Sequence, residues 1–248
     1  MNIFITGGSR GIGAQLVKFF FDHGYNVAFT YKSASDKAEK IVEEALLSSA
    51  NSAQKCQAWQ LDVTNARQVD TVCENIIEEF SCIDVVINNA AIVRVGMAAT
   101  LPDEDWHDVL NANLSGPFYI SRFFLNEFLI NGGGRFIHIS SVARKGMSGQ
   151  IGYCASKAGL DGLSSAIAKE YGRKNVTSNI LCLGFFETDM AKKHMAADNI
   201  SFWNEFCPTG RTGNLSEVCA TVQFLVSEEA AFINGQTINL TGGLDWVK

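Results

Sequence analysis

Short runs of apolar residues alternate with longer amphipathic segments along the whole chain. The short runs are rich in Val, Ile and Phe at successive positions, which is typical of parallel strands covered by helices on both faces. The predicted strands lie at residues 2–6, 26–30, 57–61, 84–88, 135–140, 177–183 and 236–240. Their β-α-β-α order predicts an α/β fold, a single Rossmann-type doubly wound parallel sheet of about seven strands with helices on both faces.

The segments between the strands are long enough for helices. In residues 38–47 the apolar side chains recur every three or four positions, which predicts an amphipathic helix. The sequence predicts one long helix over residues 103–129. Its predicted start is marked by Pro102, which comes just before a group of acidic residues. There are only three prolines and no linker-like stretch, so residues 1–248 are predicted to form one domain.

Composition and charge narrow the class of protein. The chain has 26 acidic and 20 basic residues, and a net charge of -6 gives no attraction to nucleic acid or to an anionic membrane surface. The seven cysteines are scattered without a CxxC pair, so we expect reduced thiols and neither disulfides nor a metal site. No signal segment and no apolar stretch of about 18 residues is present, so we expect a cytoplasmic protein.

A glycine-rich turn follows the first predicted strand and precedes a helix. Gly7, Gly11 and Gly13 allow a tight turn, let the backbone approach a pyrophosphate, and aim a helix N-terminus at its charge. Gly24 is the predicted stop of that helix. A turn that binds no ligand is the alternative, but its position at the first strand-to-helix junction favours a dinucleotide site.

The end of the second predicted strand bears on the choice of cofactor. No acidic residue follows this strand to hydrogen-bond a ribose 2′-hydroxyl, whereas Lys32 and Arg10 are placed to pair with a 2′-phosphate. This pattern predicts NADP(H); the alternative is that both are solvated surface cations. Asp62 and Val63 follow the third strand, and residues 88–91 follow the fourth, at the sheet edge where such ligands bind.

Nine sequence blocks occur in a specific order and spacing. They are TGGSRGIG (6–13), LDV (61–63), NNAA (88–91), NANLSGPF (111–118), ISSVA (139–143), YCASKAGL (153–160), GFFETDM (184–190), PTGRTG (208–213) and INGQTINLTGG (233–243). Together they resemble the short-chain dehydrogenase/reductase family over nearly the whole chain, and within it the 3-oxoacyl-[acyl-carrier-protein] reductase branch. The resemblance implies cofactor contacts from Gly7, Ser9, Arg10, Gly11, Ile12, Gly13, Lys32, Asp62, Val63, Asn89, Ala90, Tyr153, Lys157, Gly184, Phe186 and Thr188.

The resemblance also implies catalytic roles. Tyr153 would donate a proton to the substrate oxygen, and Lys157, four residues on along a helix, would lower the tyrosine pKa and reach the nicotinamide ribose. Ser141 would hold the substrate carbonyl oxygen, with Ser140 as the alternative, and Asn113 would hold a water behind the lysine. A lone Tyr-x3-Lys is more often an ordinary surface pair, so the assignment depends on the other blocks.

The sequence departs from the family pattern at several places. Leu183 stands where a proline is usual, and Ala91 where a glycine is usual, and both positions border the cofactor cleft. At the edge expected to dock a carrier protein, residues 131–134 read NGGG in place of basic residues and leave Arg135. Arg173 and Lys174 remain in the second basic position.

The predicted lid covers about residues 188–210. Its large apolar residues suit an acyl or aryl chain, although they could equally pack the lid onto the body; they are Met190, Met195, Phe202, Trp203 and Phe206. Surplus apolar positions in 103–129 and 152–171, with an edge strand at 236–240, predict a homotetramer with two-fold axes.

The predicted function is NADPH-dependent reduction of a β-ketoacyl thioester, carried by acyl carrier protein, in fatty-acid or polyketide/polyene-type biosynthesis. The first alternative is an NADP(H)-dependent reductase or dehydrogenase of a free ketone or alcohol. The remote alternative is a non-catalytic dinucleotide sensor, which is disfavoured because such proteins tend to lose Tyr153 or Lys157. An enoyl reductase is disfavoured because that branch spaces its tyrosine and lysine more widely.

Overall fold

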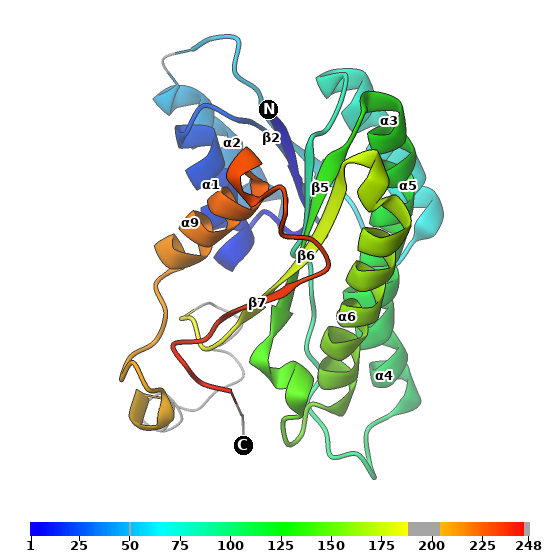
Figure 1. Cartoon of the computed structure of the whole chain (residues 1–248), viewed down its shortest axis with the longest axis vertical. Coiled ribbons are helices and arrows are strands. Elements are labelled where there is room, and N and C mark those ends of the chain that lie inside the picture. The colour runs from blue at the N-terminus through cyan, green and yellow to red at the C-terminus, as the bar shows by residue number, and fades with distance from the viewer. Residues whose placement is uncertain (50, 188–203, 246–248) are drawn as a thin grey trace.

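A computed structural model describes residues 1–49, 51–187 and 204–245. In this described part seven strands form one parallel sheet in the order β3-β2-β1-β4-β5-β6-β7 (Figure 1). The strands are β1 (Asn2–Ile5), β2 (Asn26–Tyr31), β3 (Cys56–Gln60), β4 (Val85–Asn88), β5 (Gly134–Ser141), β6 (Val176–Leu183) and β7 (Thr237–Leu240). The predicted doubly wound sheet is confirmed, and every strand boundary falls within one residue of its prediction.

Helices cover both faces of the sheet. They are α1 (Gly11–Asp22), α2 (Ser35–Ser48), α3 (Ala66–Phe80), α4 (Asp103–Leu110), α5 (Gly116–Asn131), α6 (Ile151–Tyr171) and α9 (Leu215–Val226). In Figure 1, α1, α2 and α9 lie to the left of the sheet, and α3, α5 and α6 to the right. The sequence-predicted helix over 38–47 is α2, and the predicted stop at Gly24 is confirmed by its left-handed φ of 85° just after α1.

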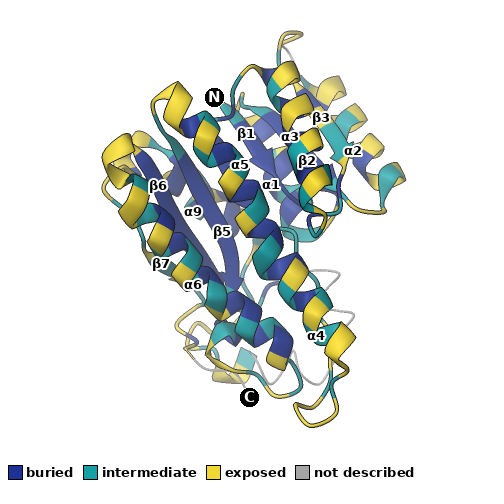
Figure 2. Cartoon of the chain, turned by 90° about the vertical axis from the view of Figure 1, so that its right-hand side faces the viewer, coloured by how far each residue is buried: buried dark blue, intermediate teal, exposed yellow. Residues whose placement is uncertain are grey.

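Two hydrophobic cores lie between these layers, because alternate residues of each strand point to opposite faces. Ile3 and Ile5 of β1 pack toward α1 and α9, whereas Phe4 between them packs toward α3 and α5. All three are 0% exposed, and burial of such side chains stabilises the fold by roughly 1.5–3 kcal/mol each. Figure 2 shows buried strands behind helices whose outer faces are exposed.

The long helix predicted over 103–129 is wrong in one respect, because a π-helical turn at Asn111–Ser115 divides it into α4 and α5. Its start is as predicted: Pro102 precedes three acidic residues in the first turn of α4. The interruption has a chemical reason. Pro117 has no N–H, so it cannot donate the α-helical hydrogen bond to the carbonyl of Asn113 four residues earlier.

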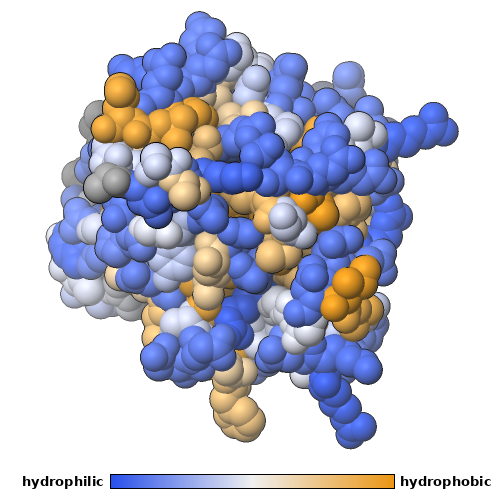
Figure 3. Space-filling view, turned by 90° about the horizontal axis from the view of Figure 1, so that it is seen from above, coloured by the Kyte–Doolittle hydropathy of each residue, from blue (hydrophilic) through white to orange (hydrophobic). Residues whose placement is uncertain are grey.

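The strands all point the same way, so their carboxyl ends share one end of the molecule, the lower end in Figure 1. The opposite end, seen in Figure 3, is mostly hydrophilic, with scattered apolar groups. Among the described residues, no helix is both long and apolar enough to cross a membrane. All seven cysteines are free thiols, five of them buried, while Cys82 and Cys207 are partly exposed.

Candidate active site

The glycine turn after β1 forms a cradle at the carboxyl end of the sheet. Gly7 has a φ of 69° and Gly11 a φ of 56°, values that side chains rarely adopt. A methyl group at Gly13 would overlap the carbonyl oxygen of Gly7 and the side-chain amide of Asn89. The turn therefore needs glycine at these positions, and it brings the N-terminus of α1 to the carboxyl ends of the neighbouring strands β1 and β4.

Asn89 holds this turn in place. Its side-chain amide donates to the carbonyl oxygens of Thr6 (2.9 Å) and Gly7 (3.0 Å). In return, the Thr6 hydroxyl accepts from the backbone N–H groups of Asn89 (3.0 Å) and Ala90 (3.1 Å). Asn89 was expected to contact the cofactor, but its side chain is used within the protein to position the turn. Thr6 was missed as a site residue, although it opens the TGGSRGIG block.

The residues expected to select the cofactor lie beside the turn. Arg10 is exposed and precedes α1 directly. Lys32 follows β2 and its Nζ lies 2.6 Å from Oδ2 of Asp62. Two residues expected to bind cofactor thus pair with each other. Burial would raise the pKa of Asp62, but hydrogen bonds from Lys32 and Thr64 outweigh it and lower that pKa.

The remaining expected residues of this region are more buried. Ser9 is 6% exposed and lies in the turn, while Ile12 is half-buried in the first turn of α1. Val63 is 9% exposed and packs under Gly116, where a methyl group would overlap its side chain. Ser9, Ile12 and Val63 thus form the base of the candidate cofactor site.

The expected catalytic residues converge at the start of α6. The Tyr153 side chain is hydrogen-bonded to that of Ser141, at the end of β5. Lys157 lies one turn further along α6, and its Nζ is 5.6 Å from the centre of the Tyr153 ring. Lys157 is 3% exposed and donates a 2.7 Å hydrogen bond to the carbonyl oxygen of Ile139. The hydroxyl groups of Tyr153 and Ser141 thus lie close to the buried ammonium group of Lys157.

The pKa shifts at this cluster differ from the expectation. We expected Lys157 to lower the pKa of Tyr153, but desolvation dominates and raises it to about 12, against the opposing hydrogen bond from Ser141. Burial also lowers the pKa of Lys157 to about 8. Tyr153 is therefore a neutral phenol at neutral pH and carries a proton that it could donate to a carbonyl oxygen.

The two candidate serines occupy different environments. Ser140 is 2% exposed, and its hydroxyl donates to the carbonyl oxygen of Lys157 (3.1 Å), which ties β5 to α6. Ser141 accepts from the N–H of Ala143 (3.2 Å) and faces Tyr153. The structure therefore places Ser141, and not Ser140, beside the tyrosine.

Asn113 is fully buried in the π-helical turn. Its amide nitrogen donates to the carbonyl oxygen of Ile92 (2.9 Å) and to the Ser156 hydroxyl (3.1 Å), and its amide oxygen accepts from the N–H of Ile92 (2.8 Å). The side chain thus joins the segment after β4 to α6. Ser156, next to Lys157 in sequence, was not identified from the sequence.

The loop after β6 closes the site on another side. The N–H of Gly184 donates to Leu240 (2.9 Å), and a methyl group there would overlap the backbone of Thr241. Phe186 is 6% exposed, with its side chain in the core on the α9 side. Leu183, where proline was usual, pairs with Leu240 in the sheet. Thr188 and the predicted lid residues Met190, Met195, Phe202 and Trp203 lie outside the described residues.

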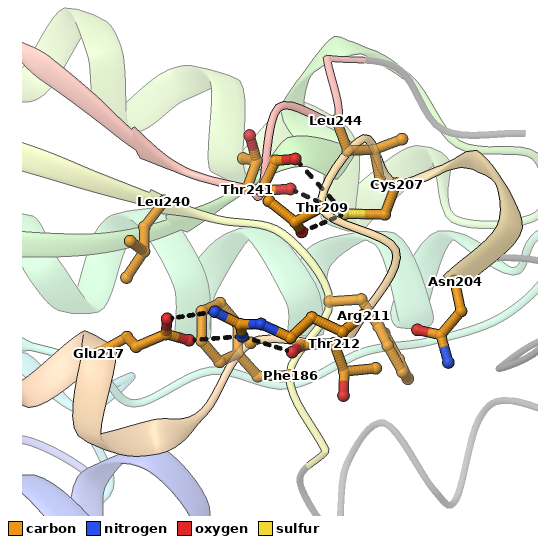
Figure 4. Close-up of a pocket in the computed structure, with 13 residues that line it drawn as sticks. Phe186, Asn204, Cys207, Thr209, Arg211, Thr212, Glu217, Leu240, Thr241 and Leu244 are labelled. Atoms are coloured by element: carbon orange, nitrogen blue, oxygen red, sulfur yellow. Dashed lines mark hydrogen bonds and ion pairs between the residues drawn. The ribbon is translucent and has the colours of Figure 1, made fainter.

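A pocket of about 130 Å³ lies next to this loop but does not include the tyrosine cluster. It is bounded by the loops after β6 and β7 and by the segment that leads to α9 (Figure 4). Arg211 points to Glu217 there, with contacts of 2.7 and 3.0 Å. Since its walls hold neither Tyr153 nor Lys157, the candidate chemistry is assigned to the tyrosine cluster and not to this pocket.

Two structural observations bear on carrier docking. Arg135 is only 7% exposed, and its guanidinium binds the carbonyl oxygen of Val226 (3.0 Å) and the Glu228 carboxylate (2.7 Å). Arg135, the basic residue left at that edge, is therefore not available to dock a carrier protein. Arg173 and Lys174 are exposed, but they follow the far end of α6, about 30 Å from Tyr153 at 1.5 Å per residue.

Comparisons with known proteins agree with this geometry. A family model described as Enoyl-(Acyl carrier protein) reductase matches residues 7–245. The 3-oxoacyl-[acyl-carrier-protein] reductase FabG of Salmonella typhimurium is 34% identical over 241 residues, which cover 97% of this chain and 95% of that protein. The protein of the same name from Chlamydia muridarum is 34% identical over 242 residues, with 97% and 95% covered.

Solved structures give the same result. A mutant of a short-chain dehydrogenase/reductase from Serratia marcescens is similar to this chain with a TM-score of 0.90 and 29% sequence identity, over 98% of this chain and 97% of that one. The resemblance found in the sequence blocks is thereby confirmed. This chain belongs to the short-chain dehydrogenase/reductase family and is an oxidoreductase of that family.

Proposed function

We propose that this protein reduces a β-ketoacyl thioester to the 3-hydroxyacyl thioester with NADPH, in the cytoplasm, where its free thiols would stay reduced. The observation that carries the proposal is the hydrogen-bonded Tyr153 and Ser141 pair with Lys157 buried beside it, at the same sheet edge as the glycine cradle. The relatives named 3-oxoacyl-[acyl-carrier-protein] reductase support the substrate class.

Each residue of the cluster has a distinct part in this proposal. A dinucleotide held in the glycine cradle would supply the hydride for the carbonyl carbon. The Ser141 hydroxyl holds the carbonyl oxygen, and Tyr153 donates its proton to that oxygen. The buried ammonium of Lys157 stabilises the phenolate that remains, because an opposite charge favours the ionised form.

Asn113 would complete the proton path through its backbone. Because Pro117 cannot donate to the Asn113 carbonyl oxygen, that oxygen lacks its α-helical partner and is a candidate to hold a water behind Lys157. The three hydrogen bonds of its side chain would keep the π-helical turn, and with it this carbonyl, in a fixed position.

The cradle fits a dinucleotide. Glycines that leave no room for a methyl group, at the N-terminus of α1, let a backbone approach a pyrophosphate. Gly7, Ser9, Gly11, Ile12 and Gly13 would hold the pyrophosphate, with Asp62, Val63 and Ala90 on the adenosine side and Gly184 and Phe186 on the nicotinamide side.

NADPH should be preferred over NADH, and Arg10→Ala and Lys32→Ala should each reduce that preference by about tenfold, since a charge-assisted contact to the 2′-phosphate is lost. Fluorescence titration with both cofactors measures it. Lys18→Ala, an exposed lysine of α1, is the matched control and should change neither affinity. Equal affinities of the unmodified protein for the two cofactors would rule out this selection.

The substrate class is tested by NADPH oxidation over a panel of β-ketoacyl thioesters and free ketones. The proposal requires thioesters to be far better substrates than free ketones of the same chain length. The buried state of Arg135 favours the alternative, a reductase of free ketones, because it removes one expected docking contact. Equal kcat/KM for both classes would establish that alternative.

Arg173 and Lys174 should matter only for carrier-bound substrate. Reversing both charges should lower kcat/KM for a thioester on acyl carrier protein by about tenfold at low salt, with the loss fading as salt screens the attraction. A small free thioester should be unaffected, since these residues lie far from Tyr153. Equal losses for the two substrates would contradict carrier docking at this position.

We also propose a homotetramer, which would allow a neighbouring subunit to supply the docking residues. The exposed apolar side chains Phe118, Leu129 and Ile130 on α5, and Phe232 next to the edge strand β7, support it. Light scattering should give four times the 27.0 kDa chain mass at micromolar concentration. A monomer would refute the assembly.

A further inference from the structure

Arg144 joins the end of β5 to α6 close to the candidate catalytic cluster. It lies in the 3₁₀ turn Val142–Lys145, which begins directly after Ser141. Its Nη1 lies 2.5 Å from Oδ2 of Asp161 on α6, and its guanidinium also hydrogen-bonds the Cys182 thiol on β6. Arg144 therefore links the turn to both α6 and β6.

Asp161 is at the centre of these contacts. It follows Tyr153 and Lys157 at intervals of four residues, so all three lie on one face of α6. Its second carboxylate oxygen accepts a 2.9 Å hydrogen bond from the Thr237 hydroxyl of β7. One carboxylate thus connects the turn after β5, α6 and the edge strand, and it is the only carboxylate among the described residues that pairs with Arg144.

The turn that Arg144 holds is the one that aims Ser141. The Ser141 hydroxyl accepts from the N–H of Ala143 within this turn and contacts Tyr153 across the gap to α6. On the strand side of Ser141, the Ser140 hydroxyl already bonds the Lys157 carbonyl oxygen. On the other side the chain continues through Gly146, with a φ of 110°, and the turn is held there by Arg144 on Asp161 and by the Lys145 ammonium, which donates to the carbonyl oxygen of Asp245 (2.9 Å).

We propose that Arg144 is a positioning residue for the reduction, because its pairing with Asp161 keeps the Ser141 hydroxyl against Tyr153. This inference rests on the proposed function. Arg144 acts through geometry, since its guanidinium pairs with Asp161 on α6. The Arg144 and Asp161 side chains are 21% and 34% exposed, so solvent screens this ion pair less than it would screen a fully exposed one.

The test is a set of double-mutant cycles on the full chain. Arg144→Ala should lower kcat for a β-ketoacyl thioester by about tenfold, as small displacements of reacting groups do, with an unchanged dissociation constant for NADPH. Asp161→Asn, which keeps the side-chain volume, should lower kcat in the same way. The two changes together should cost no more than one alone, because they remove the same contact.

The decisive cycle combines Arg144→Ala with Ser141→Ala. If Arg144 acts through Ser141, its replacement should have no further effect on kcat once the Ser141 hydroxyl is gone. Arg144→Lys, which can still pair with Asp161, should recover part of the activity, whereas Arg144→Gln should not. Lys55→Ala, which breaks a 2.8 Å pair with Glu79 elsewhere, is the control and should leave kcat unchanged.

The outcomes distinguish failure of the positioning role of Arg144 from failure of the proposed function. An equal loss on Arg144→Ala with and without Ser141, or a fall in melting temperature with kcat unchanged, would overturn the positioning role while leaving the proposed function intact. Full activity of both Ser141→Ala and Tyr153→Phe would overturn the proposed function and this inference together.

Discussion

Replacing Tyr153 with phenylalanine is expected to lower kcat by about 10³-fold, because it removes the proton donor and leaves the ring in place. The dissociation constant of NADPH should change by less than twofold, since the hydroxyl bonds Ser141 and not the glycine cradle. Steady-state assays and fluorescence titration measure the two quantities.

Tyr171→Phe is the matched control for this variant. Tyr171 ends the same helix and packs against the core on the α5 side, far from Ser141. It should retain nearly full activity. If Tyr153→Phe kept more than a tenth of the unmodified rate, Tyr153 would not be the general acid.

Replacing Gly13 with alanine should weaken NADPH binding by about 100-fold, through the overlap of the new methyl group with the Gly7 carbonyl and the Asn89 amide. Relief of the overlap must move the turn, and overpacking of this kind costs about 1–3 kcal/mol. Titration of NADPH and the melting temperature should both show the change.

Gly162→Ala on α6 is the control for Gly13→Ala. A methyl group at Gly162 meets open space, and alanine is favoured over glycine inside a helix by up to about 1 kcal/mol. This variant should bind NADPH normally and melt at the same or a higher temperature. Normal NADPH affinity of Gly13→Ala would show that the cradle is not the dinucleotide site.

The sheet was predictable because buried parallel strands leave a local signal, a run of apolar residues long enough to cross the core. The break between α4 and α5 left a weaker signal. Residues 103–129 have helical periodicity throughout, and only the missing N–H of Pro117 indicates where the α-helical hydrogen bonds must change.

The sequence named the candidate site residues but not the contacts that they make with one another. The sequence blocks named Asn89 and Asp62 as cofactor residues, and the end of the second predicted strand named Lys32. Their hydrogen bonds to Thr6 and Gly7, and the ion pair between Lys32 and Asp62, depend on strands that meet only in the folded sheet. The choice between Ser140 and Ser141 likewise needed the position of α6.

Burial also reversed one electrostatic expectation. On a helix, a lysine four residues from a tyrosine suggests a lowered tyrosine pKa when only the positive charge of the lysine is considered. In the folded chain both groups lose solvent, so the pKa of Tyr153 rises to about 12 and that of Lys157 falls to about 8. Spacing alone does not reveal how much solvent a site excludes.

The most direct test of the account follows a deuterium label from NADPH deuterated at nicotinamide C4. The protein is given equal amounts of a 3-oxobutyryl and a 2-butenoyl thioester, and the products are identified by mass spectrometry. The account predicts 3-hydroxybutyryl thioester with one deuterium on C3, unchanged 2-butenoyl thioester, and label transfer about 10³-fold slower with Tyr153→Phe. A labelled saturated butyryl thioester, or label transfer by Tyr153→Phe at more than a tenth of the unmodified rate, would contradict it.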